Sequence, residues 1–172
     1  MNYSNIDFMS IVDGEGCRVT LFVSGCRNHC KGCFNEQTWN FNFGSEFTPI
    51  QENEIIEGCK KSYISGLTIL GGEPFEEENQ TALLPFIEKF KKECPDKNLW
   101  MYTGYVLDKD LITGGKKYVE NVTDKILSYV DVLVAENLNA IPGLTDLLEA
   151  DLALIQAEGM RAAVRSVIPA EA

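Results

Sequence analysis

Short apolar segments alternate with longer helical patterns over the first 134 residues of the chain. Each of these segments is only a few residues long and rich in β-branched or aromatic residues, which predicts buried strands. The predicted strands are 18–24, 67–70, 99–103 and 130–134. Because neighbouring parallel strands must be joined by a crossover, usually a helix, the alternation predicts an α/β fold with a mostly parallel sheet.

The segments between the strands carry signals for helices. Thr48 can cap a helix, Pro49 suits the first helical position, and Gln51 can complete a capping box. Further helices are predicted over 78–94, where Pro85 implies a kink or a late start, and over 117–129.

Three unusual segments each follow a predicted strand: the cysteines at 26–33, the turn at 71–74, and residues 102–104. Ligands of parallel α/β sheets bind at the carboxyl ends of the strands. We therefore expect these segments to converge at one edge of the sheet and to form one site.

The first of these segments contains Cys26, Cys30 and Cys33, spaced Cys-x3-Cys-x2-Cys. Three thiolates at this spacing can bind three corners of a 4Fe–4S cluster and leave the fourth iron without a protein ligand. An open iron can chelate the amino and carboxylate groups of a substrate. One electron passed into a bound sulfonium would then break a carbon–sulfur bond, with the cofactor supplying the difficult chemistry.

Spacing alone leaves other interpretations open. The three cysteines could bind zinc, with His29 or a distant cysteine as the fourth ligand. Cys17 or Cys59 could complete an ordinary cluster, or the thiols could serve the core or disulfides. Apolar surroundings nevertheless predict that Cys17, Cys59 and Cys94 are buried thiols.

Several motifs together resemble the radical S-adenosylmethionine superfamily. Within it, the chain is most similar to the activating proteins of anaerobic (class III) ribonucleotide reductases. The motifs that carry the resemblance include Asp13-Gly14-Glu15-Gly16-Cys17-Arg18, Cys30-Lys31-Gly32-Cys33-Phe34-Asn35, Gly71-Gly72-Glu73-Pro74 and Tyr102-Thr103-Gly104-Tyr105.

The resemblance implies a partial, open (β/α) barrel of the radical S-adenosylmethionine type. It implies a 4Fe–4S cluster on the three clustered cysteines and S-adenosylmethionine as the second cofactor, with no catalytic residue beyond the cluster ligands. The implied cofactor contacts are Gly32, Cys33 and Phe34 near the adenine, and Gly71, Gly72, Glu73 and Pro74 near the methionine amino group. The implied partners are the large subunit of the anaerobic reductase, which would receive a glycyl radical, and a flavodoxin-type electron donor.

Two rival functions remain. The Gly14-Glu15-Gly16 turn also suggests another small radical enzyme, such as a 7-carboxy-7-deazaguanine synthase. A non-enzymatic zinc or iron–sulfur module would instead show four protein ligands to its metal.

Charge and hydropathy narrow the classes of partner. A net charge of −11 argues against nucleic-acid binding, which needs a positive surface. No apolar run approaches the roughly 20 residues of a membrane span, and no secretion signal is visible, so we expect a cytoplasmic protein without a membrane partner.

Composition divides the chain near residue 134. Residues 1–134 contain one alanine and eleven lysines, whereas residues 135–172 contain nine alanines and no lysine. We predict a radical S-adenosylmethionine core over 1–134. The atypical segment 135–172 departs from the family pattern at Ala135-Glu136-Asn137, reads as helical up to Gly159, and has the composition of a foreign or replaced end.

Overall fold

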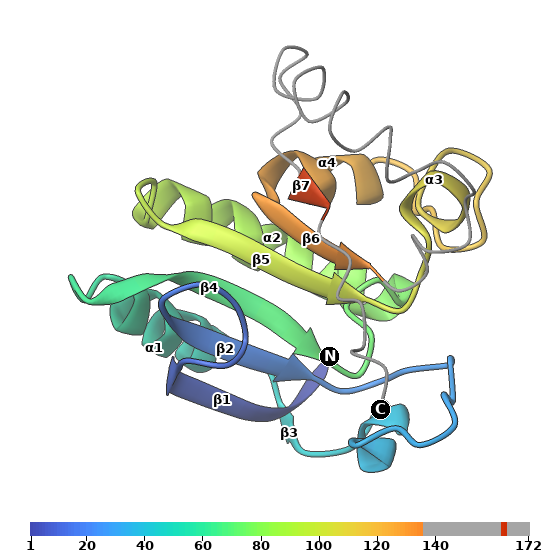
Figure 1. Cartoon of the computed structure of the whole chain (residues 1–172), viewed down its shortest axis with the longest axis horizontal. Coiled ribbons are helices and arrows are strands. Elements are labelled where there is room, and N and C mark those ends of the chain that lie inside the picture. Colours follow the sequence, from blue (N-terminus) through green and yellow to red (C-terminus); the bar gives the residue numbers. More distant parts are fainter. Residues whose placement is uncertain (136–162, 165–172) are drawn as a thin grey trace, which may run out of the picture.

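The structure, a computed structural model, describes residues 1–135 and 163–164. Strands and helices alternate through most of this part (Figure 1). In chain order the elements are β1 (Asn2–Ser10), β2 (Cys17–Val23), the 3-10 helix η1 (Glu36–Trp39), β3 (Ser45–Glu46), α1 (Pro49–Cys59), β4 (Ile64–Gly71), α2 (Glu77–Glu93), β5 (Asn98–Thr103), α3 (Leu107–Asp110), α4 (Thr123–Tyr129), β6 (Val132–Ala135) and β7 (Ala163–Val164).

The described strands form one sheet in the order β3-β1-β2-β4-β5-β6-β7. Strands β2, β4, β5, β6 and β7 run parallel, whereas β1 pairs antiparallel with both β2 and β3. The predicted α/β class with a mostly parallel sheet is therefore confirmed. Among the described strands the sheet is open, because β3 and β7 are its two edges.

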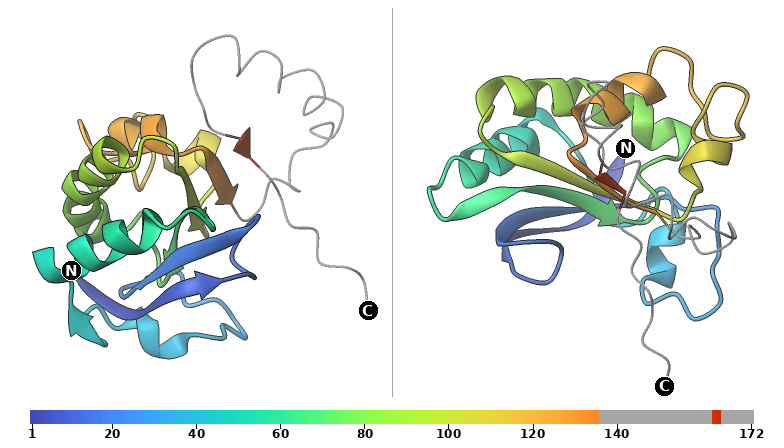
Figure 2. Two further views of the ribbon diagram at one scale, coloured as in Figure 1. Left: turned by 90° about the vertical axis from the view of Figure 1, so that its left-hand side faces the viewer. Right: turned by 45° about the horizontal axis from the view of Figure 1, so that its top comes forward.

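Helices α1, α2 and α4 cover one face of this sheet, as Figures 1 and 2 show. The strand residues that point toward these helices are apolar and fully buried, and they interdigitate with the apolar stripes of the helices. The core of this layer includes Val19, Leu21, Val23, Ile55, Ile56, Leu67, Ile69, Leu83, Phe86, Ile87, Phe90, Leu99, Met101, Ile126 and Leu133. No described helix is long and apolar enough to cross a bilayer.

The opposite face of β2 and β4 carries polar side chains. Arg18 is fully buried there, donates to Thr68 Oγ1 at 2.6 Å, and lies 5.0 Å from the ring centre of Trp100. Thr68 donates in turn to the carbonyl of Asp13 at 2.8 Å, so the loop after β1 is tied to this face. Burial lowers the pKa of Arg18 to about 10. Arg18 thus packs beneath a loop as a structural cation and lies at the far end of β2 from the clustered cysteines.

The predicted start of α1 is confirmed. The Thr48 hydroxyl accepts from Ile50 N at 3.3 Å, while the Gln51 side chain accepts from Thr48 N at 3.2 Å. This capping box with Pro49 in the first turn fixes the helix to begin where the sequence indicates.

The predicted helix over 117–129 is too long. Helix α4 begins only at Thr123, because Asn121 has a positive φ of 62° and residues 120–122 form a turn. The strand predicted over 130–134 also begins later than expected, because β6 spans Val132–Ala135.

The sequence reasoning also missed β1, whose mixed polar residues show no clear alternation. Two register shifts in its pairing with β2 explain why a simple period of two is absent. The helix predicted to end at Gly159 lies outside the described residues.

Candidate functional site

The three unusual segments meet where β2, β4 and β5 end. Gly72 N donates to the carbonyl of Val23 at 2.8 Å, and Glu73 N donates to the carbonyl of Gly25 at 2.8 Å. Gly104 N, just after β5, donates to Glu73 Oε2 at 2.8 Å. The predicted convergence at one edge of the sheet is therefore confirmed.

Glycine at two positions permits the close packing of these segments. Gly25 has a φ of +97°, and a Cβ there would lie 2.2 Å from the Phe41 ring. A Cβ on Gly72 would lie 2.7 Å from the carbonyl oxygen of Gly25. The turn after β4 thus uses a glycine to bring its backbone against the backbone that leads into the cysteine loop.

Glu73 connects the three segments through its side chain. Its Oε1 accepts from Phe75 N at 2.9 Å and from Thr103 Oγ1 at 2.8 Å. Its Oε2 accepts from Gly104 N and, at 3.4 Å, from Asn28 Nδ2 in the cysteine loop. The residue is 1% exposed, and this burial raises its pKa to about 7 against the opposing effect of the hydrogen bonds. The carboxylate that the sequence offered to an ammonium group is therefore already bonded by four protein donors.

The cysteine loop, residues 26–33, follows β2 directly. Cys26 is buried, Cys33 is half-buried and Cys30 is exposed. Burial raises the pKa of the Cys26 thiol. The loop folds back on itself at Gly32, where φ is +79°, and Asn35 N donates to Cys33 Sγ at 3.4 Å. Backbone N–H donation to a sulfur is one of the ways in which proteins tune iron–sulfur clusters.

Within the described residues, no three His, Cys, Asp or Glu side chains lie close enough to hold one metal ion. A cubane cluster makes a different demand, because each thiolate binds a different iron and the three sulfurs need not meet at one point. Three soft thiolate donors on one eight-residue loop suit such a cluster by their chemistry.

The remaining cysteines lie far from this loop. Cys17 begins β2, whereas Cys26 follows its end, and a seven-residue strand is roughly 20 Å long. Cys59 and Cys94, at the ends of α1 and α2, are almost completely buried in the core. The expectation that these two are buried thiols is confirmed, while Cys17 is only half-buried. None of the three is placed to complete a cluster on the loop.

His29 sits between two of the clustered cysteines, and its ring packs on Trp39 with 4.4 Å between the ring centres. Trp39 ends η1, which is fixed to the cysteine loop because Cys26 N donates to its carbonyl at 3.3 Å. The indole Nε1 of Trp39 and the Oγ of Ser24 are buried and have no hydrogen-bond partner among the described residues. Buried donors of this kind usually have a partner, so their place beside the cysteine loop fits a bound group with acceptor atoms.

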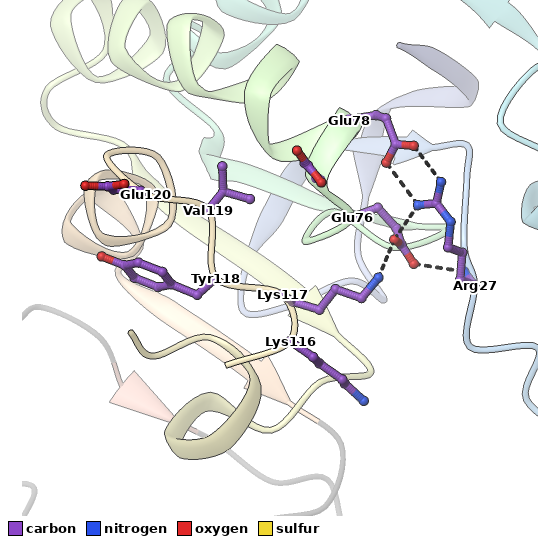
Figure 3. Close-up of a pocket in the computed structure, with 9 residues that line it drawn as sticks. Arg27, Glu76, Glu78, Lys116, Lys117, Tyr118, Val119 and Glu120 are labelled. Carbon is purple, nitrogen blue, oxygen red and sulfur yellow. Dashed lines mark hydrogen bonds and ion pairs between the residues drawn. The ribbon is translucent and has the colours of Figure 1, made fainter. Parts of the chain in front are cut away.

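A second acidic side chain, Glu76, anchors the outer side of the loop (Figure 3). It accepts hydrogen bonds from Arg27, Tyr105 and Lys117. Burial opposes ionisation, but these donors outweigh it and lower the pKa of Glu76. Arg27 also pairs with Glu78, which lowers the pKa of Glu78 to about 2.

The ion pairs of Arg27 with Glu76 and Glu78 border a cavity of about 430 Å³. The same cavity is also lined by Lys116, Tyr118, Val119 and Glu120. Arg27 is paired with two carboxylates, those of Glu76 and Glu78. The roles of Glu76, Tyr105 and Lys117 were missed. The acidic run at 76–78 was the only signal for them in the sequence. The sequence does not show that Glu76 is buried while Glu77 and Glu78 are exposed, because the fold decides this.

Comparison with known proteins finds one matching family and several similar relatives. Residues 12–140 match the family described as 4Fe-4S single cluster domain. The anaerobic ribonucleoside-triphosphate reductase-activating protein of Haemophilus influenzae is 41% identical over 136 residues, which cover 78% of this chain and 82% of that protein. The protein of the same name from Enterobacteria phage T4 is 37% identical over 134 residues, covering 78% and 79%. That of Escherichia coli K12 is 40% identical over 111 residues, covering 63% and 72%.

The family match over residues 12–140 includes strands β2, β4, β5 and β6, the cysteine loop and the turn after β4. The chain therefore contains a 4Fe–4S single cluster domain and belongs to the family of anaerobic ribonucleoside-triphosphate reductase-activating proteins.

Proposed function

We propose that this protein is a radical S-adenosylmethionine activase that generates the glycyl radical of an anaerobic ribonucleotide reductase. The observation that carries the proposal is the cysteine loop itself: three thiols lie on one loop at the carboxyl edge of the sheet, and the other three cysteines lie beyond its reach. Family membership supports the reductase as partner. The fold would then be a partial, open (β/α) barrel, and the reaction an oxidoreduction in the cytoplasm.

Cys26, Cys30 and Cys33 would hold the 4Fe–4S cluster. When bound, a cluster with one open iron supplies a single electron to the sulfonium of S-adenosylmethionine, and the resulting 5′-deoxyadenosyl radical removes hydrogen from a glycine of the reductase. The protein's part is to position and shield these groups. A flavodoxin-type protein would deliver the electron.

The turn after β4 would position the methionine end of S-adenosylmethionine. Glu73 is already bonded by four donors, so we assign recognition of the amino group to the backbone of Gly71, Gly72 and Pro74, which Glu73 holds in place. Gly32, Cys33 and Phe34 would adjoin the adenine. The fully exposed ring of Phe34 is available for such a contact.

Anaerobic reconstitution with iron and sulfide tests the proposal. The reduced protein should convert S-adenosylmethionine to 5′-deoxyadenosine, and it should raise a glycyl radical signal in electron paramagnetic resonance when the cognate reductase is added. Cleavage without a glycyl signal would contradict the assigned partner.

Metal analysis separates the rival functions. About four irons and four sulfides per chain agree with the activase, whereas one zinc would indicate a non-enzymatic module. Turnover of a pterin substrate would indicate the 7-carboxy-7-deazaguanine synthase reaction instead.

A further inference from the structure

Glu76 is a buried acidic residue outside the turn at 71–74, one position before α2 begins. Its carboxylate is inaccessible to solvent and accepts four hydrogen bonds. Oε1 accepts from Arg27 N at 2.9 Å and from Tyr105 Oη at 2.8 Å. Oε2 accepts from Arg27 Nη1 at 2.7 Å and from Lys117 Nζ at 2.6 Å. A carboxylate with every oxygen engaged by donors holds these partners in a defined arrangement.

The donors come from three separate segments of the chain, as Figure 3 shows for two of them. Arg27 belongs to the cysteine loop, Tyr105 follows β5, and Lys117 lies between α3 and α4. Lys117 is itself fixed from α2, because Gln80 Nε2 donates to its carbonyl at 2.9 Å. Glu76 therefore ties the cysteine loop to parts of the structure that are held independently.

The contact with Arg27 bears directly on Cys26. The N–H of Arg27 belongs to the peptide unit that links it to Cys26, so its hydrogen bond to Glu76 fixes the orientation of that peptide. On the other side, Cys26 N donates to the carbonyl of Trp39. Both peptide units around the first cysteine are thus anchored, and Glu76 supplies one of the two anchors.

Charge adds to this geometry. The single carboxylate of Glu76 faces two cations, Arg27 and Lys117, and the Lys117 side chain is only 17% exposed. Glu78 pairs with Arg27 from the solvent side and is 52% exposed. Removing the charge of Glu76 would leave its two cations without their buried partner, which is far more disruptive than loss of an exposed pair.

We propose that Glu76 is a positioning residue for the iron–sulfur cluster: its buried carboxylate orients the Cys26–Arg27 peptide and thereby places the first cluster thiolate. The inference rests on the proposed function for the presence of the cluster. The anchoring of the loop, however, can be measured in protein without any cluster.

The test compares Glu76→Gln with Glu78→Gln, which makes the same chemical change to the other, exposed partner of Arg27. In cluster-free protein, hydrogen exchange of the amides of residues 26–28 should become at least about tenfold faster in Glu76→Gln. It should change less than about twofold in Glu78→Gln, and the core strands should be unaffected in both.

After anaerobic reconstitution, the reduced cluster of Glu76→Gln should give an altered electron paramagnetic resonance spectrum. Its midpoint potential should also be more positive, because the variant loses a negative charge beside the Cys26–Arg27 peptide, which stabilises the more negative reduced state. If Glu76 contributed only to global stability, the spectrum of the protein that remains folded would be unchanged.

Wild-type exchange and an unchanged spectrum in Glu76→Gln would overturn the inference. If that variant does not fold, Tyr105→Phe is the milder alternative, because it removes only one donor to Glu76. Wild-type exchange at residues 26–28 and a wild-type spectrum in Tyr105→Phe would then overturn the inference equally. A wild-type protein that binds no four-iron cluster would instead refute the proposed function, while the exchange experiment would still report whether Glu76 anchors the loop.

Discussion

The six cysteines fall into two groups, one on an irregular loop and the other at the ends of helices and a strand. Cys26, Cys30 and Cys33 lie on a loop at the carboxyl edge of the parallel sheet, where exposure varies from buried to exposed. Cys17 lies at the start of β2, and Cys59 and Cys94 lie at the helix ends, where the last two are enclosed by apolar side chains. The same residue type is thus offered for ligation in one region and packed as a small apolar side chain in the other.

The reason for the difference is backbone geometry. Cys59 is the last residue of α1, whose periodicity directs it into the core, and Cys94 is the buried residue that caps α2. Burial raises the pKa of Cys59 to about 12. The cysteine loop has residues in the left-handed region, His29 and Gly32. Two buried carboxylates hold it from outside: Glu76 accepts from the backbone N–H of Arg27, and Glu73 accepts from the side-chain amide of Asn28. The thiols that we propose as ligands thus lie on a loop that is irregular and nevertheless held in place.

The comparison predicts opposite outcomes for single alanine substitutions in the two groups. Cys26→Ala, Cys30→Ala and Cys33→Ala should each lower bound iron after anaerobic reconstitution by at least about tenfold, since each removes one of the three proposed ligands. Cys17→Ala should retain the wild-type iron content. Iron and sulfide analysis checks this, and a loss of iron in Cys17→Ala would refute the division.

Thiol alkylation in the cluster-free protein sharpens the comparison. A pKa of about 12 instead of 9.0 leaves Cys59 with roughly 1000-fold less thiolate near neutral pH, and burial excludes the reagent as well. Cys30, which is exposed, should be modified first, and Cys59 should react at least about 1000-fold more slowly. Mass spectrometry of peptides over time measures both rates. Comparable rates at the two positions would show that the core opens readily.

The region of the cysteine loop also depends on Glu73. Glu73→Ala should lower the free energy of unfolding by about 3–5 kcal/mol, because Phe75 N, Thr103 Oγ1 and Gly104 N would lose a buried acceptor. Glu77→Ala, at an exposed position in the first turn of α2, should cost less than about 0.5 kcal/mol. Urea titration of the two variants measures the contrast. An equal loss of unfolding free energy in the two variants would show that the hydrogen bonds to Glu73 contribute nothing to stability.

A last prediction concerns the pH dependence of stability. The folded pKa of Glu73, about 7, exceeds its ordinary 4.5, so the folded state binds the proton more tightly than the unfolded state. Relative to Glu73→Gln, wild-type stability should therefore be greatest below pH 4.5 and fall by roughly 3 kcal/mol as the pH rises through 7. Unfolding curves of both proteins between pH 4 and 8 provide the measurement. A pH-independent difference would contradict the raised pKa.

Local signals made the elements around the site predictable. The apolar runs of β2, β4 and β5, the capping box at Thr48 and the glycine-rich turn after β4 all depend on neighbours within a few residues. Strand β1 and the length of α4 were not predictable in this way. The first has irregular register against β2, and the second is cut short by a left-handed Asn121.

The sequence by itself determined which residue types could carry chemistry: three closely spaced thiols, and a glycine-rich acidic turn at the next strand end. It also determined that they would share one edge of the sheet, because consecutive parallel strands end on the same side. Tertiary structure alone decided which charges are buried. Glu73 and Glu76 are buried, while Glu77 and Glu78 are exposed. Which carboxylates are buried depends on hydrogen-bond donors that are distant in the sequence, such as Asn28 for Glu73 and Lys117 for Glu76, and only the folded chain brings these groups together.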